Sequence, residues 1–280
     1  MIIEKKSGRF YILAAAVLWS FAGICSKLIP WGALSIACIR GLIAALTIGI
    51  ANRKFTFKPT PSILLGAFGI FITSVLFMIA NKITTAVNAI VIQYTAPVFV
   101  IILSAIFFKV KPKKLDIAIV FVTLIGISVF FIDHLEQGSI LGDLLALLSG
   151  LSFALVFFAN KMPGADSMSA SYLGCLLHGL LIPFLFFDEN IGNLDLKIAL
   201  IVLFNGVIQL GMAYIFFSKG IKTTSAVSAS IIAMLEPILN PIWVFLLINE
   251  RPSPLSIIGA IIVIAAIGIY NALNSQKATS

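Results

Sequence analysis

The sequence predicts an all-α membrane protein with ten transmembrane helices, arranged as two inverted five-helix repeats. Hydrophobic residues make up 60% of the 280 residues and charged residues only 11%, too few to cover a soluble protein of this size. The apolar residues form continuous runs close to the ~20 residues that a helix needs to cross hydrocarbon, whereas a barrel would show short alternating segments. In addition, the chain matches itself at an offset of 140 residues.

The apolar segments follow one another with short loops, so the chain has no room for an inserted soluble domain. Each segment is long enough to span the bilayer as a helix. The predicted spans are residues 11–29, 31–51, 63–80, 85–108, 114–132, 142–162, 168–187, 198–218, 224–248 and 254–273.

The internal repeat divides the chain into residues 1–135 and 136–280. Ala86-Val87-Asn88-Ala89 aligns with Ala226-Val227-Ser228-Ala229, and Pro97 aligns with Pro237, without a gap. Because each unit holds an odd number of predicted spans, the second unit begins on the opposite side of the membrane from the first. This inverted repeat is the architecture of many secondary transporters.

The basic residues predict the topology. With the amino terminus inside, most of the 19 Lys and Arg residues lie at cytoplasmic ends, as the positive-inside rule requires. They are Lys5, Lys6, Arg9, Arg53, Lys54, Lys58, Lys109, Lys111, Lys113, Lys114, Lys161, Lys219, Lys222 and Lys277. We therefore expect a multi-pass protein of the cytoplasmic (inner) membrane with both termini cytoplasmic and the 133–141 loop outside. The net charge of +8 follows from this topology, and we expect no nucleic-acid partner.

Two ionisable residues fall near the middle of predicted spans, Arg40 in the second and Glu236 in the ninth. An unpaired charge at such a position costs about 2.5–3.5 kcal/mol or more, so each must face a partner, a wet cavity or a substrate. Arg40 keeps its proton, whereas Glu236 can exchange one. Glu236 and, after it, His178 are therefore candidates for proton coupling. The alternatives are an arginine that only clamps helices together and a histidine that only packs.

Pro97 and Pro237 are predicted to kink the fourth and ninth spans, because proline removes a backbone hydrogen bond and leaves carbonyl groups free to line a cavity. Polar and aromatic residues around them and on other spans suit a small organic solute, although such residues can also join helices by hydrogen bonds. The candidate substrate-binding residues are Trp19, Arg40, Gln93, Tyr94, Tyr214, Glu236, Asn240 and Trp243.

Signatures of catalysis are missing from the sequence. It has no histidine pair at metal-ligand spacing, no glycine loop that would cradle phosphate and no nucleophile elbow. We therefore expect no enzyme activity, no metal and no cofactor, and transport would have to be driven by gradients.

The pattern resembles the drug/metabolite transporter superfamily, in particular its ten-helix EamA-like members, over essentially the whole chain. The matching segments are Leu18-Trp19-Ser20-Phe21, Arg40, Thr84-Thr85-Ala86-Val87-Asn88-Ala89, Leu235-Glu236-Pro237 and Asn249-Glu250. The resemblance implies a central pocket lined by helices one, three and four of each unit, gating by helices two and seven, and support from helices five and ten. The chain departs from the family at Lys109-Val110-Lys111-Pro112, where Gly-Glu is usual.

Together these features predict a secondary transporter that exports a small metabolite such as an amino acid by alternating access. Arg40 would bind a carboxylate, and Glu236 would bind an ammonium group or carry a proton. The alternatives are a carrier of a cationic or nucleoside-like metabolite such as S-adenosylmethionine, a drug efflux carrier, or a membrane scaffold. The expected partners are the substrate and the lipid bilayer, and the sequence leaves a homodimer open.

Overall fold

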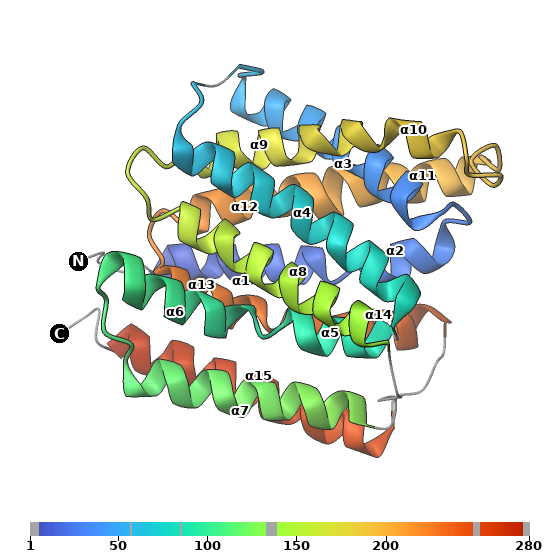
Figure 1. Ribbon diagram of the computed structural model, residues 1–280. Helices are drawn as coiled ribbons and strands as arrows, with labels where there is room; N and C mark the ends of the chain where they lie inside the picture. Colours follow the sequence, from blue (N-terminus) through green and yellow to red (C-terminus); the bar gives the residue numbers. More distant parts are fainter. Residues whose placement is uncertain (1–5, 57, 85, 133–138, 249–252, 277–280) are drawn as a thin grey trace.

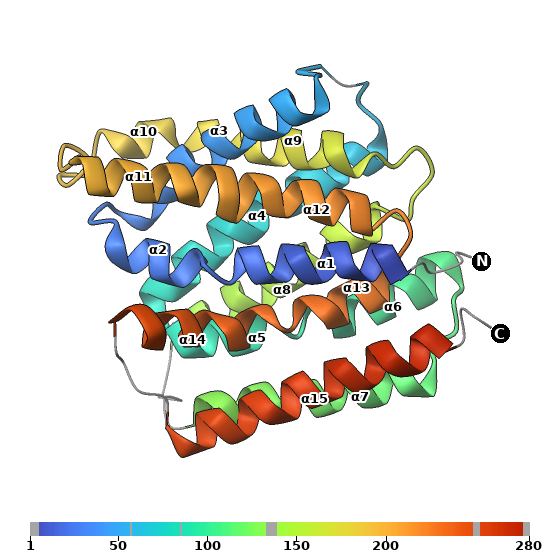
Figure 2. The same ribbon diagram turned by 180° about the vertical axis from the view of Figure 1, so that it is seen from behind.

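The computed structural model is a bundle of helices (Figure 1) and describes residues 6–56, 58–84, 86–132, 139–248 and 253–276. These ranges hold no strand. The start of α1 and the end of α15 lie at the same end of the bundle, and α2 and α14 lie at the other (Figures 1 and 2). The bundle therefore has one end that carries both chain termini and an opposite end.

Within the described residues, the first half of the chain forms seven helical segments, two pairs of which are interrupted spans. They are α1 (Lys6–Trp19), α2 (Ala22–Leu28), α3 (Ala33–Asn52), α4 (Pro61–Ile83), α5 (Ala86–Gln93), α6 (Ala96–Phe108) and α7 (Lys114–Phe131).

The second half is more interrupted, with a 3-10 segment, η2, and a π-helical segment, η3. Its elements are α8 (Ile140–Ala159), α9 (Ser167–Leu177), η2 (His178–Leu181), α10 (Ile182–Leu185), α11 (Leu196–Phe204), η3 (Asn205–Met212), α12 (Ala213–Gly220), α13 (Ala226–Ala233), α14 (Glu236–Ile248) and α15 (Pro254–Gln276).

Eight helices in the described ranges are long and apolar enough to cross a membrane, against ten spans predicted from the sequence. They cover Lys6–Ser26, Ala33–Asn52, Pro61–Ala80, Ala89–Phe108, Ile140–Ala159, Ser167–Leu185, Leu196–Gly220 and Pro254–Leu273. Large apolar side chains such as Phe107, Phe121 and Ile261 are more than half exposed on the outside of the bundle. A surface of this kind suits lipid, and the chain is a multi-pass membrane protein.

The fourth and ninth predicted spans break at equivalent places. The bounds of α5 and α6 recur in α13 and α14, each 140 residues later. Each break falls just before the proline, Pro97 or Pro237, which lies at the second position of the following helix. A proline cannot donate to the preceding turn, so the helix ends there. Gly150 of α8 fits against the break in the first half, where a Cβ would lie 2.8 Å from the carbonyl oxygen of Gln93.

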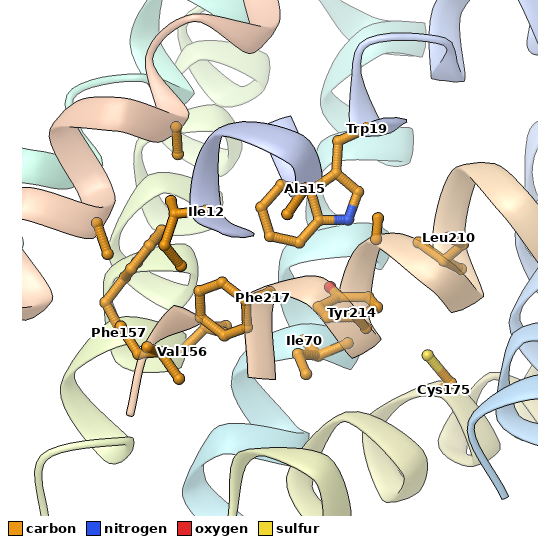
Figure 3. Close-up of a cluster of buried hydrophobic side chains, with 14 of the residues drawn as sticks. Ile12, Ala15, Trp19, Ile70, Val156, Phe157, Cys175, Leu210, Tyr214 and Phe217 are labelled. Carbon is orange, nitrogen blue, oxygen red and sulfur yellow. The ribbon is translucent and has the colours of Figure 1, made fainter. Parts of the chain in front are cut away.

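The two halves of the chain pack into each other. Helix α4 lies along α8, and α12 lies along α1, so a helix of each half contacts a helix of the other half. Helices α7 and α15 pack together along one side of the bundle (Figures 1 and 2). A cluster of buried apolar residues joins both halves between α1, α4, α8, α9 and α12 (Figure 3). Burial of this shared surface stabilises one arrangement of the halves.

The first helix begins earlier than predicted, at Lys6 and not near residue 11. Arg9, which the sequence placed among the cytoplasmic charges, is only 7% exposed, and its Nη1 donates a hydrogen bond of 3.3 Å to the carbonyl oxygen of Asn271. The hydropathy pattern had placed Arg9 before the first helix. Its hydrogen bond to α15 allows this arginine to lie within α1.

Candidate functional site

A cavity of about 420 Å³ lies in the middle of the bundle. Its wall is contributed by both halves of the chain. The lining residues are Trp19, Ala22, Gly23, Ser26, Ala33, Arg40, Ile70, Thr73, Ser74, Phe77, Met78, Ile90, Gln93, Tyr94, Phe153, His178, Leu210, Tyr214, Glu236 and Pro237. The lining is mostly apolar with a few convergent polar groups, as in sites for small organic ligands.

The lining residues of the cavity come from the middle of the bundle and from α2. Trp19, Leu210 and Tyr214 belong both to its wall and to the apolar cluster shown in Figure 3. The wall continues along α2, through Gly23 and Ser26, at the end of the bundle away from the termini.

Arg40 reaches the cavity from α3 and is 9% exposed. Its Nε has no hydrogen-bond partner among the described residues. The next residue, Gly41, lies against His178, and a Cβ there would be 2.5 Å from the Cβ of His178. Arg40 and His178 line the same cavity.

Glu236 is the first residue of α14 and also faces the cavity. The break before α14 therefore places a carboxyl group at a helix amino terminus, where the helix dipole favours negative charge. A side-chain hydrogen bond links Glu236 to Tyr94, which lies at the equivalent break in the first half. Arg40 is near enough to attract Glu236, but no direct ion pair between them occurs in the described part of the chain.

Aromatic rings form much of the remaining wall. Trp19 meets Tyr214 edge to face, with ring centroids 5.3 Å apart, and Phe153 contacts both Trp19 and Tyr94 at 6.3 and 6.4 Å. Such rings present apolar surface together with a polar edge. The cavity thus combines an arginine, a carboxyl group and aromatic walls, an arrangement that can hold a small zwitterionic or amphipathic molecule.

Gln93 lines the cavity and also braces two helices. Its Nε2 donates to Ser149 Oγ over 2.8 Å, and Ser149 Oγ donates to the carbonyl oxygen of Thr73 over 3.0 Å. This chain of hydrogen bonds connects α5 through α8 to α4. One of the two amide hydrogens of Gln93 is therefore used in a hydrogen bond within the protein and does not bind a ligand.

His178 lies where α9 gives way to η2 and is 2% exposed. Its Nδ1 lies 3.0 Å from the carbonyl oxygen of Gly174, so Nδ1 carries a proton. The ring meets Phe71 edge to face at 5.5 Å. Nε2 has no hydrogen-bond partner in the ranges that the structure describes.

Three of the residues selected from the sequence lie elsewhere or are not described. Trp243 is not among the described residues that line the cavity. It instead contacts Ser20 and Phe21 at the break between α1 and α2. Pro97 is buried in α6 and is not among the described residues that line the cavity. The side chain of Asn240, in α14, lies outside the described residues.

The resemblance implied that the third span, α4, lines the pocket, but the candidate residues selected from the sequence included none of its side chains. The structure places Ile70, Thr73, Ser74, Phe77 and Met78 of α4 in the cavity lining. These residues follow the i, i+3, i+4 spacing of one helix face. Thr73 and Ser74 are adjacent hydroxyl residues in the middle of an otherwise apolar span. This pair of hydroxyl residues could have indicated, from the sequence, that one face of α4 lines a polar cavity.

No group of three or more His, Cys, Asp or Glu residues that could hold a metal ion occurs among the described residues. The candidate site is therefore discussed in terms of the side chains that line the cavity.

Comparison with known proteins agrees with the resemblance expected from the sequence. The family described as the EamA-like transporter family matches the chain twice, over residues 6–132 and 140–272. A protein of Clostridium kluyveri named "uncharacterized transporter" is 24% identical over 98% of this chain and 95% of its own length. A protein of the same name from Archaeoglobus fulgidus is 25% identical over 94% of this chain and 95% of its own length.

Two further comparisons concern the membrane and the fold. The Salmonella typhimurium protein named "uncharacterized inner membrane transporter YicL" is 22% identical over 98% of both chains. One solved crystal structure superposes with a TM-score of 0.83 over 96% of this chain and 99% of that chain, at 16% identity. This superposition shows that the fold is shared.

Proposed function

Because the chain belongs to the EamA-like transporter family, we propose that it is a secondary active transporter that exports amino acids or related small metabolites by alternating access. The observation that carries this proposal is the cavity that holds Arg40 and Glu236 together among aromatic side chains. A guanidinium group can bind a carboxylate through two hydrogen bonds, and a carboxylate can bind an ammonium group. An amino acid offers both partners.

We also propose the finer architecture of ten transmembrane helices in two inverted repeats, residues 1–135 and 136–280. In this arrangement α7 and the interrupted pair α13 and α14 complete the ten crossings. The matching breaks 140 residues apart and the twofold family match support it. Inverted repeats place a substrate site near the membrane midplane, where the two units meet.

The proposed location is the cytoplasmic membrane, with both termini in the cytoplasm. The distribution of basic residues supports this orientation. The end of the bundle that carries α2 and α14 then faces outward. Lining residues of the cavity include Gly23 and Ser26 of α2, on that side of the bundle.

Transport into proteoliposomes tests the function. The purified chain is reconstituted and loaded with a mixture of unlabelled amino acids and organic cations. Labelled amino acids or labelled organic cations are then added outside under imposed pH and ion gradients. We expect counterflow of at least one zwitterionic amino acid that empty liposomes lack. Counterflow restricted to organic cations without a carboxylate would contradict the proposal and favour a cationic metabolite or drug. No transport of any solute would favour the scaffold alternative.

A further inference from the structure

One wall of the cavity carries a group of polar atoms without protein partners. They are Arg40 Nε on α3, Thr73 Oγ1 and Ser74 Oγ on α4, and His178 Nε2 on η2. Each atom is buried and lacks a hydrogen bond within the part of the chain that the structure describes, and all four residues line the same cavity. Buried polar groups without partners are uncommon in folded proteins and require a specific explanation.

The two hydroxyl groups differ from three other helical hydroxyl groups in the described part of this protein. Thr47, Thr123 and Ser152 each donate to the carbonyl oxygen four residues earlier, at 2.8, 2.7 and 2.9 Å. This bond is the usual way for a helical Ser or Thr in an apolar environment to satisfy its hydroxyl group. Thr73 and Ser74 do not make it.

The backbone at these two residues is held in place from outside α4. The carbonyl oxygen of Thr73 accepts the hydrogen bond from Ser149 Oγ, which in turn accepts one from Gln93. Helix α4 also lies along α8 over much of its length. The rotation of α4 that places Thr73 and Ser74 in the cavity lining is therefore set by contacts with α5 and α8.

We propose that Thr73 and Ser74 form, together with Arg40, the carboxylate-binding half of the substrate site and determine specificity for carboxylated substrates. The inference rests on the proposed function and names residues that recognise its substrate. A carboxylate accepts several hydrogen bonds, and a guanidinium group and two hydroxyl groups supply donors. Ammonium recognition at the same wall is disfavoured because Arg40 carries a positive charge.

The remaining unpartnered atom fits the same site. Since the Nδ1 of His178 carries its proton toward Gly174, the Nε2 of the neutral ring accepts a hydrogen bond. It can therefore accept a hydrogen bond from a hydroxyl group of the bound molecule. Glu236, on α14, supplies the acidic partner of the site.

The experiment measures the binding of three probes that share one ring and differ in charge. They are 3-phenylpropionate, which has only the carboxylate, phenethylamine, which has only the ammonium group, and L-phenylalanine, which has both. Affinities are measured by calorimetry on the purified full chain and on its variants Thr73→Val and Ser74→Ala. The matched controls are Thr123→Val and Ser152→Ala. Each of these hydroxyl groups donates a hydrogen bond within its own helix, and neither residue is among the described residues that line the cavity.

We expect each α4 variant to bind 3-phenylpropionate and L-phenylalanine about 10-fold more weakly, the loss typical of a hydrogen bond to a charged group. Phenethylamine binding should stay within about 2-fold, and both controls should bind all probes as the unmodified chain does. Thr73→Ser keeps the hydroxyl group and should restore most of the affinity. If Thr73→Val fails to fold, Ser74→Ala, a smaller change, decides the result.

Carboxylate binding that is unchanged in the folded α4 variants would overturn the inference. So would an equal loss for phenethylamine, or an unmodified chain that binds neither carboxylated probe. The proposed function can fail separately. If 3-phenylpropionate binding depends on Thr73 and Ser74 but proteoliposomes transport no amino acid, the carboxylate subsite stands and the amino-acid transport proposal does not.

Discussion

The indole N–H of Trp243 donates a hydrogen bond of 2.7 Å to the hydroxyl oxygen of Ser20, across 223 residues of sequence. The Trp243 ring also stacks on Phe21 with centroids 4.4 Å apart. Ser20 and Phe21 form the break between α1 and α2, and Gln209 Nε2 donates to the carbonyl oxygen of Trp19 at the same break. Two side chains of the second half thus hold the interrupted first helix, whose residues line the cavity.

Trp243→Phe should weaken this support while keeping an aromatic ring on Phe21. Loss of one hydrogen bond is expected to lower the free energy of unfolding by about 1 kcal/mol, since Ser20 Oγ retains its bond to the carbonyl oxygen of Val17. The measurement is thermal unfolding of the purified protein in detergent. Trp243→Ala removes the ring as well and should lower the midpoint further. Equal midpoints for the two variants would show that the N–H group carries the whole contact.

Gly41→Ala should destabilise the contact between α3 and η2. The added methyl group would lie 2.5 and 2.6 Å from Cβ and Cγ of His178, so one helix must shift, at a cost of about 1–3 kcal/mol. Gly179→Ala is the matched control, because its Cβ would meet Leu42 at 3.4 Å, an ordinary contact. Thermal unfolding of both variants compares them. If both variants had a similar thermal unfolding midpoint, the added methyl group at position 41 would be accommodated by a small movement of α3 away from η2.

Arg40→Lys should reduce transport of carboxylated substrates about 10-fold or more, because an ammonium group cannot make the two parallel hydrogen bonds of a guanidinium group. The variant keeps the positive charge and should insert and purify normally. Uptake of labelled amino acid into proteoliposomes measures the loss, and size-exclusion chromatography measures the fold. An aggregated or unfolded variant would instead indicate that Arg40 serves mainly to clamp helices.

Glu236→Gln should abolish gradient-driven accumulation while leaving some substrate exchange. The amide keeps the shape and hydrogen bonding of the carboxyl group but neither ionises nor releases a proton. Accumulation is measured in proteoliposomes under an imposed pH gradient, and exchange is measured without one. Undiminished accumulation with the same pH dependence would exclude Glu236 as the proton carrier. His178, which also lines the cavity, would then be the next residue to test.

The proposed topology predicts which loops are accessible from outside. In a chain without native cysteines, a cysteine at Asn190, in the exposed loop between α10 and α11, should react with an impermeant reagent on intact cells. A cysteine at Lys58, in the exposed loop between α3 and α4, should react only after the cells are opened. The opposite labelling pattern would reverse the orientation. A cysteine at position 278 should also be protected, because the carboxyl terminus is predicted to be cytoplasmic.

The membrane character and the family could be predicted from the sequence because both depend on local information. Hydropathy is a property of each segment, and residues such as Arg40 and Glu236 stand out because a charge in an apolar span is costly whatever surrounds it. The prolines at 97 and 237 mark the places where the helices break for the same local reason.

The sequence by itself determined that Arg40 and Glu236 need special surroundings, and only the tertiary structure placed them in one cavity. It also decided that Thr73 and Ser74 face that cavity and that Trp243 instead supports the break at Ser20. The physical reason is that the direction in which a side chain points depends on the rotation of its helix. That rotation is set by contacts with distant segments, such as Gly150 against the carbonyl group of Gln93, which no local pattern in the sequence encodes.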